Sequence, residues 1–182
     1  MADNNKARQG MLEGKDKILL FRRLKDSDKE AAKLAFQTEH TFKLERETDA
    51  IPTKDGTIVK LGDLEGEVTG IEAVQAKDDP VATMLQGSVL DGEKLELWEV
   101  TVDEDLEDDG KFPAMYAQGY LTNWEASAPT EDESTYSGDF KIELVPQFGF
   151  ATLTEEQQTA IQYAFRDTVP ENDGGGDDET PS

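Results

Sequence analysis

The sequence predicts a mainly β protein: an antiparallel two-sheet sandwich or flattened barrel with a flanking α-helix. Several segments alternate apolar and polar residues with a period of two, which is typical of half-buried strands. Connections rich in Gly, Pro, Asp and Thr separate these segments, and only two stretches have helical spacing. The 182 residues suit one domain. We expect it over residues 15–168, between a flexible segment at 1–14 and a disordered acidic tail at 169–182.

The first long alternating segment runs from residue 34 to residue 46. Its polar side chains fall on one face, and the opposite face carries Leu34, Phe36, Phe42 and Leu44. His40, the one histidine of the chain, shares that apolar face. We therefore interpret His40 as a packed side chain whose ring is satisfied, rather than as a catalytic base.

Two later segments repeat the alternation. Between residues 63 and 74, Leu64, Val68 and Val74 oppose Asp63, Glu65 and Glu67; between 139 and 144, Phe140, Ile142 and Leu144 oppose Asp139, Lys141 and Glu143. Shorter β-rich runs lie at 17–24, 57–61 and 95–102. Tyr116, Tyr120 and Trp124 recur every fourth residue, which also suits a helix, but Gly119 and the β-branched and aromatic neighbours favour a strand.

Two helices are predicted. Asp78, Asp79 and Pro80 supply the cap and first turn of the first, and Gly92 ends it after an apolar stripe of Val81, Met84, Leu85 and Val89. The second begins at Thr154, whose capping-box partner is Gln157. Its apolar positions are Ala160, Ile161, Ala164 and Phe165, and Pro170 stops it.

The composition excludes several classes of function. The chain carries 41 Asp and Glu against 18 Lys and Arg, a net charge of −23, which argues against binding nucleic acid through charge. It has no cysteine and one histidine, so neither a thiol nucleophile, a Ser-His-Asp arrangement nor a multi-histidine metal site is convincing. We predict no enzymatic activity, no cofactor and no membrane segment.

The acidic loop at residues 103–110 has partial calcium-loop spacing. Asp105, Glu107, Asp109 and Gly110 fit, but Tyr116 stands where a bidentate Glu belongs and no helix precedes the loop. A solvated hairpin loop is favoured. Two alternative functions stay open: a calcium- or carbohydrate-binding β-sandwich that uses this loop, and an acidic nucleic-acid mimic that inhibits a basic DNA-binding protein.

The order of four segments resembles a known family. They are KILLFRRL, KDGTIVKLGDLEGEVTG, DDPVATMLQGSVLDGEKLELWEV and GYLTNWEASAPTEDESTYSGDFKIELV. From about Lys15 to Thr168 the chain is similar to the major tail protein, or tail-tube protein, of long non-contractile-tailed phages of Gram-positive hosts. The resemblance implies a tail-tube β fold without catalytic residues, located in the virion tail after synthesis in the host cytoplasm.

The resemblance also implies partners. Six copies form a ring, rings stack into a hollow tube, and genome DNA passes through without specific binding. Tape-measure, tail-terminator and distal-tail proteins are the expected further partners. Carboxylates repeated around such a ring would make an acidic wall along which DNA slides. The candidate lumen-lining residues are Asp63, Glu65, Glu67, Asp139 and Glu143.

Stacking requires one surface to meet a different surface on the next ring. Residues 1–50 hold 11 basic and 10 acidic residues, whereas the remainder holds 7 and 31. We therefore predict inter-ring contacts between basic residues near the N-terminus (Lys15, Lys17, Arg22, Arg23, Lys25) and the acidic loop (Asp103, Glu104, Asp105, Asp108, Asp109). The segment from Asp49 to Gly56 is interpreted either as part of an extended arm that contacts neighbours or as a self-contained hairpin turn.

Overall fold

The computed structural model describes residues 10–161, and side chains within the last helix only to Gln158. The elements, in chain order, are η1 (Gly14–Asp16), β1 (Lys17–Arg23), η2 (Leu24–Asp26), β2 (Ala32–Lys33), β3 (Gln37–Thr53), β4 (Gly56–Val74), α1 (Pro80–Asp91), β5 (Leu95–Thr101), η3 (Glu104–Leu106), β6 (Phe112–Ser127), β7 (Thr135–Ala151) and α2 (Glu155–Ile161). The predicted mainly β fold is confirmed. No helix among the described residues is long and apolar enough to cross a membrane.

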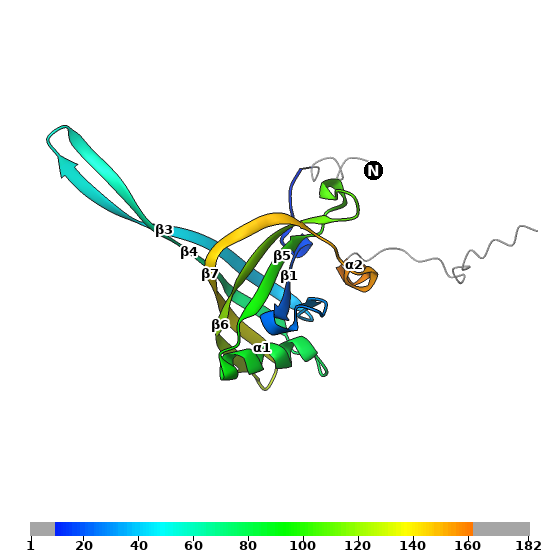
Figure 1. Ribbon diagram of the computed structural model, residues 1–182. Coiled ribbons are helices and arrows are strands. Elements are labelled where there is room, and N and C mark those ends of the chain that lie inside the picture. Colours follow the sequence, from blue (N-terminus) through cyan, green and yellow to red (C-terminus); the bar gives the residue numbers. More distant parts are fainter. Residues whose placement is uncertain (1–9, 162–182) are drawn as a thin grey trace, which may run out of the picture.

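The seven described strands form a single antiparallel sheet in the order β2-β1-β5-β6-β7-β4-β3. The expected flattened barrel is therefore made from one continuous sheet that curls, and not from two separate ones (Figure 1). Curling brings β3 close to β1, where a side chain joins them. The backbone N–H of Leu19 donates to Oε1 of Gln37 at 2.9 Å, and Nε2 of Gln37 donates to the Leu19 carbonyl at 2.6 Å. The Gln37 amide thus occupies the place of a peptide group at the seam of the barrel.

The main core lies inside this curled sheet. Val68, Phe140 and Leu97 are fully buried there, and α1 adds Val81 and Leu85. The α1 helix forms where it was predicted: the Asp79 carboxylate accepts from the backbone N–H groups of Val81 and Ala82, and Gly92 ends the helix with a φ of 65°. It lies across the lower end of the barrel in Figure 1. A capped amphipathic helix therefore covers the apolar end of the sheet.

A smaller core covers the opposite face of β1 and β5. It contains Ile18, Leu20, Val100, Val102, Phe112 and Leu153. The predicted capping box is present, since Thr154 N donates to Gln157 Oε1 at 3.1 Å and Gln157 N donates to Thr154 Oγ1 at 3.2 Å. Gln157 also donates to the Ala31 carbonyl at 2.9 Å, which ties α2 to the barrel. The apolar positions predicted from Ala160 onward, and the stop at Pro170, lie outside the described side chains.

Three residues predicted on buried strand faces are exposed instead. Phe36 lies in the turn before β3, with a φ of 48°, and Leu144 interrupts the alternation of β7 with a φ of 65°. Leu44 lies where β3 leaves the barrel. Leu34 is buried as predicted, although it precedes the strand. The predictions failed where the backbone departs from regular strand geometry, which breaks the link between sequence parity and face.

The hairpin of β3 and β4 extends well beyond the barrel (Figure 1). Every residue from 43 to 63 is exposed, and we call residues 44–63 the arm. The segment from Asp49 to Gly56 forms its tip, where Thr53 pairs with Gly56. Ten residues of extended chain, from Leu44 to Thr53, reach about 30 Å. The extended-arm interpretation therefore describes the shape, while contact with neighbours stays a prediction.

The segment around Gly119 is the strand β6, as the sequence favoured. Gly119 is required by the close approach of β7: a Cβ there would lie 2.0 Å from the carbonyl oxygen of Lys141. No side chain fits at that distance, so the glycine permits the two strands to cross closely in the barrel wall.

Candidate functional site

A row of charged side chains crosses the outer face of the sheet at the base of the arm. The strand registers place Lys43, Glu67, Lys141 and Tyr120 opposite one another on β3, β4, β7 and β6. The Lys141 ammonium lies 3.1 Å from Glu65 and 3.9 Å from Glu67, and that of Lys43 lies 3.7 Å from Glu67. The structure therefore brings two candidate lumen residues, Glu65 and Glu67, together with cations that the sequence interpretation did not pair with them.

Two further ion pairs extend the row. The Lys43 ammonium lies 2.5 Å from Glu45, and Lys94 pairs with the candidate lumen residue Glu143. Hydrogen bonding to Glu45 raises the pKa of Lys43, and the same bond lowers the pKa of Glu45. Hydrogen bonding to Glu143 raises the pKa of Lys94. Because Lys43, Glu45 and Glu143 are exposed and Lys94 is only half-buried, salt screens their attraction and each pair stabilises the fold only weakly.

The other two candidate lumen residues differ from each other. Asp139 accepts from Gly70 N at 2.9 Å and from Asn123 Nδ2 at 2.6 Å. It thereby holds the irregularity where the β4–β7 register shifts between Val68 and Ile71. Asp63 is exposed at the base of the arm. Around the row, four carboxylates lie near three ammonium groups, so this face is mixed in charge within one copy, and the acidic lumen wall stays a prediction.

The five basic residues predicted to make inter-ring contacts all pair within their own chain. Lys15 lies 2.7 Å from Glu13, Lys17 lies 2.8 Å from Glu99, Arg22 lies 2.6 Å from Glu96, Arg23 lies 2.8 Å from Glu93, and Lys25 also pairs with Glu93. The side chains of Lys15 and Lys25 are the most exposed of the five. The predicted inter-ring contacts stay a prediction, and those two lysines are the best placed to make them.

Glu96 is buried within a polar network that the sequence did not reveal. It accepts from Arg22 Nε at 2.6 Å and from the Tyr116 hydroxyl at 2.8 Å. The Arg22 guanidinium also lies 5.0 Å from the centroid of the Trp98 ring. Hydrogen bonding to Glu96 raises the pKa of Arg22, and burial raises the pKa of Tyr116. A carboxylate inside an apolar run such as 95–102 is the signal that a paired cation must lie nearby.

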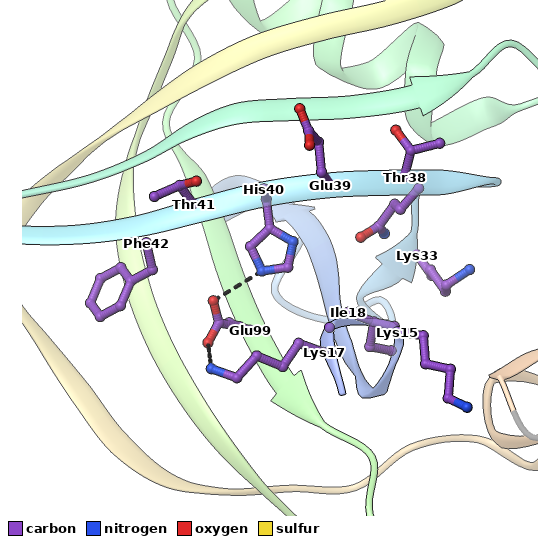
Figure 2. Close-up of a pocket in the computed structure, with 12 residues that line it drawn as sticks. Lys15, Lys17, Ile18, Lys33, Thr38, Glu39, His40, Thr41, Phe42 and Glu99 are labelled. Carbon is purple, nitrogen blue, oxygen red and sulfur yellow. Dashed lines mark hydrogen bonds and ion pairs between the residues drawn. The ribbon is translucent and has the colours of Figure 1, made fainter. Parts of the chain in front are cut away.

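His40 lies beside Glu99 in an open cleft of about 710 Å³ between β3 and β1 (Figure 2). Its Nε2 lies 3.0 Å from Glu99 Oε2, while Lys17 Nζ lies 2.8 Å from Glu99 Oε1. The side chain of His40 is only 9% exposed, so the prediction of a packed, satisfied histidine is confirmed. Burial alone would raise the pKa of Glu99, but the hydrogen bonds from His40 and Lys17 lower it below its ordinary value. With Gln37, Glu99 therefore joins the two sides of the seam.

The acidic loop connects the antiparallel strands β5 and β6, as a hairpin loop should. Asp103 accepts from Asp105 N at 2.9 Å and so caps η3. Asp108 and Lys111 exchange two backbone hydrogen bonds around Asp109 and Gly110, which both have positive φ. Within residues 10–161 no group of three or more His, Asp or Glu side chains is arranged to hold a metal ion.

Comparisons with known proteins define the class to which this architecture belongs. The sequence pattern of the phage tail tube protein family matches residues 11–148. A protein named as a tail protein of Staphylococcus phage phiMR25 is 31% identical over 175 residues, which cover 93% of this chain and 90% of the relative. The chain belongs to the phage tail tube protein family, and the resemblance seen in the sequence is confirmed.

Solved structures agree with this assignment. The tail tube of SPP1 superposes with a TM-score of 0.71 at 17% identity, over 88% of this chain and 96% of that one. The tail of a gene transfer agent particle, refined with C6 symmetry, gives a TM-score of 0.61 at 15% identity, over 76% of this chain and 99% of that one. At these identities the likeness establishes the fold. The protein is a structural subunit of the phage tail tube, located in the virion tail.

Proposed function

We propose that six copies of this chain form a ring and that stacked rings make the conduit through which genome DNA leaves the particle. Family membership and the tail-tube fold carry the proposal. An arm exposed along its whole length also supports it, because a two-stranded ribbon is marginally stable by itself and gains most from a partner. Subunits are present in the host cytoplasm before assembly, and tape-measure, tail-terminator and distal-tail proteins are the further partners that the family resemblance implies.

Electron microscopy of the purified full chain tests this proposal. Tubes or six-fold rings, visible by negative stain across a range of protein concentrations, are the expected result. Closed assemblies of another symmetry, or assemblies without a central passage, would contradict it.

We also propose that the row of charged side chains, with Asp63 and Asp139, faces the lumen. Its excess of carboxylates repels a polyanion, while the interspersed lysines limit repulsion between neighbouring copies. DNA would then pass without a continuous cationic surface to which it could adhere.

Neutralising three of the carboxylates, with Glu65→Gln, Glu67→Gln and Glu143→Gln, tests the lumen assignment. We expect tubes of normal appearance with slower DNA release. The control, with the same change in charge, neutralises three exposed carboxylates in the turn between β6 and β7: Glu131→Gln, Asp132→Asn and Glu133→Gln. Equal release rates in both sets would remove the lumen assignment.

The contact between Lys15, Lys25 and the acidic loop of a neighbouring subunit is proposed for ring stacking. Exposed pairs contribute about 0 to 1 kcal/mol each, but a ring repeats every pair. We expect tube assembly to weaken as salt is raised. Assembly that is indifferent to salt would count against this contact.

A further inference from the structure

One part of the barrel carries no charged residues. Almost a third of all residues are charged, yet residues 112–123 of β6 and 144–154 of β7 and its exit contain none. The two segments are paired strands, with Phe112 opposite Ala151 and Tyr116 opposite Gln147. They form a continuous charge-free area, and we call its β7 part, residues 144–151, the neutral edge.

The neutral edge is apolar and open. Phe148 is 71% exposed, and Phe150 lies two residues further along the same face, opposite Pro113. β4 pairs with β7 only up to Ile142, so beyond that point no described strand covers the other side of β7. An uncharged, exposed strand edge favours association, and proteins that avoid association place charges there.

The arm carries the other exposed apolar area. In its register Thr48 lies opposite Leu61, Ala50 opposite Val59 and Pro52 opposite Thr57. These six residues share one face of the ribbon, and none is charged. The other face has Ile51 opposite Ile58, followed by Asp49 opposite Lys60. We call the uncharged face, centred on Val59 and Leu61, the neutral face of the arm.

Electrostatics limits where two copies can touch. Each chain has a net charge of −23, so close contact between average surfaces places carboxylates against carboxylates. The neutral edge and the neutral face avoid this repulsion, and both expose large aliphatic or aromatic side chains. The arm points away from its own barrel (Figure 1), so its neutral face is available to another copy.

We propose that the neutral face of the arm of one copy packs against the neutral edge of β7 in a neighbouring copy, with Val59 and Leu61 against Phe148 and Phe150. This contact joins unlike surfaces, so it propagates from subunit to subunit rather than closing as a dimer. The inference rests on the proposed tube, and it names the surface that receives the arm.

Cysteine crosslinking tests the contact directly, because the natural chain has no cysteine. The full chain carrying Val59→Cys and Phe148→Cys is treated with a short bismaleimide across a range of protein concentrations. We expect a ladder of covalent dimers, trimers and larger species that grows with concentration. Each single variant should remain monomeric on a denaturing gel. The proposed contact joins the arm of one copy to the neutral edge of another, so it brings no two identical cysteines together.

The matched control is Ile58→Cys combined with Phe148→Cys. Ile58 is 57% exposed and Val59 is 63% exposed, but the two point to opposite faces of the arm. We expect at least about a tenfold weaker ladder from the control, since its cysteine faces away from the partner. A ladder of equal strength, no ladder at all, or dimers from Val59→Cys alone would overturn the proposal.

Assembly provides a second measurement. Val59→Asp should raise the concentration needed for assembly by roughly tenfold, whereas Ile58→Asp should change it little. The two variants carry the same added charge on adjacent residues. If both variants assemble like the natural chain, the proposed arm contact is wrong and the proposed tube is unaffected. If the natural chain assembles with another symmetry or without a central passage, the proposed function fails instead.

Discussion

The barrel part and the arm part of the β3–β4 hairpin differ in how their apolar residues are buried. In the barrel, Val68, Ile71 and Ala73 of β4 are buried, and their neighbours face outward. In the arm, Ile58 and Val59 are adjacent, both apolar and both exposed. One continuous pair of strands therefore changes from one-sided burial to apolar character on both faces. The core within the chain accounts for the apolar residues of the barrel, whereas it does not account for the exposed apolar residues of the arm.

This difference predicts which substitutions change the stability of the single chain and which change its association with other copies. Changes in the barrel should alter the free energy of unfolding of the single chain, because its core and seam are complete within one copy. Changes in the arm should alter association and leave unfolding almost unaffected.

The largest effect is expected at Gly119. Gly119→Ala should destabilise the fold by about 3 kcal/mol or more, because its Cβ would lie 2.0 Å from the Lys141 carbonyl oxygen and β7 must move. The control is Gly149→Ala, where a Cβ meets no atom within 4 Å. Chemical denaturation measures both. Similar midpoints for the two variants would show that the strands separate there at little cost.

A pair of valines compares the two regions most directly. Val68→Ala should cost about 2 kcal/mol, since Val68 is fully buried in the main core. Val59→Ala should change the free energy of unfolding by less than about 0.5 kcal/mol, because Val59 is exposed on the arm. Thermal unfolding of the dilute, unassembled protein separates the two. A comparable loss at both positions would mean that the arm folds as part of the barrel.

Gln37 tests the seam. Gln37→Ala removes both hydrogen bonds to the Leu19 peptide and should cost about 1 to 3 kcal/mol, because the partner groups are partly buried. Gln86→Ala on the exposed side of α1 is the control, with an expected change near zero. Hydrogen exchange at the Leu19 amide gives a local measurement. Unchanged protection in Gln37→Ala would contradict a seam held by this side chain.

Glu99 gives the seam a dependence on pH. The pKa of Glu99 is lower in the folded state than in the unfolded state. Its pairing therefore stabilises the fold at pH values above the ordinary pKa of a carboxyl group. This contribution is lost as the pH falls through the lowered pKa of the folded state. Unfolding midpoints of the natural chain and Glu99→Gln, measured from about pH 7 down to about pH 3, should converge at the acid end. Parallel profiles would exclude the pairing as the source of the dependence.

The parts of this structure that the sequence predicted are those set by local pattern. The α1 helix, the Thr154–Gln157 capping box and the assignment of β6 all follow from residues close together in the chain. The curled single sheet does not, because the bonds between Gln37 and Leu19 join residues 18 positions apart and depend on the final shape. Phe36 and Leu144 were misplaced because a left-handed residue breaks the parity on which the prediction depends.

The assembly surfaces show the same limit. The sequence identified Glu65, Glu67 and Glu143 as acidic residues on strand faces, but their partners Lys141 and Lys94 come from other strands or from the turn before β5. Register across the sheet determines which cation meets which carboxylate, and register is a property of the whole fold. The charge-free area on β6 and β7 was readable in the sequence as two uncharged segments, but only pairing makes them one surface.

The smallest effect is expected from the row of charged side chains. Lys141→Gln removes the cation shared by Glu65 and Glu67. It should nevertheless change the free energy of unfolding by less than about 1 kcal/mol, because water screens the attraction between exposed charges. The change should shrink further in high salt. Lys77→Gln, at an exposed position in the loop before α1, is a control for the lost charge. A loss well above 1 kcal/mol that persists in salt would assign the row to the stability of the barrel and not to the surface that the tube presents to DNA.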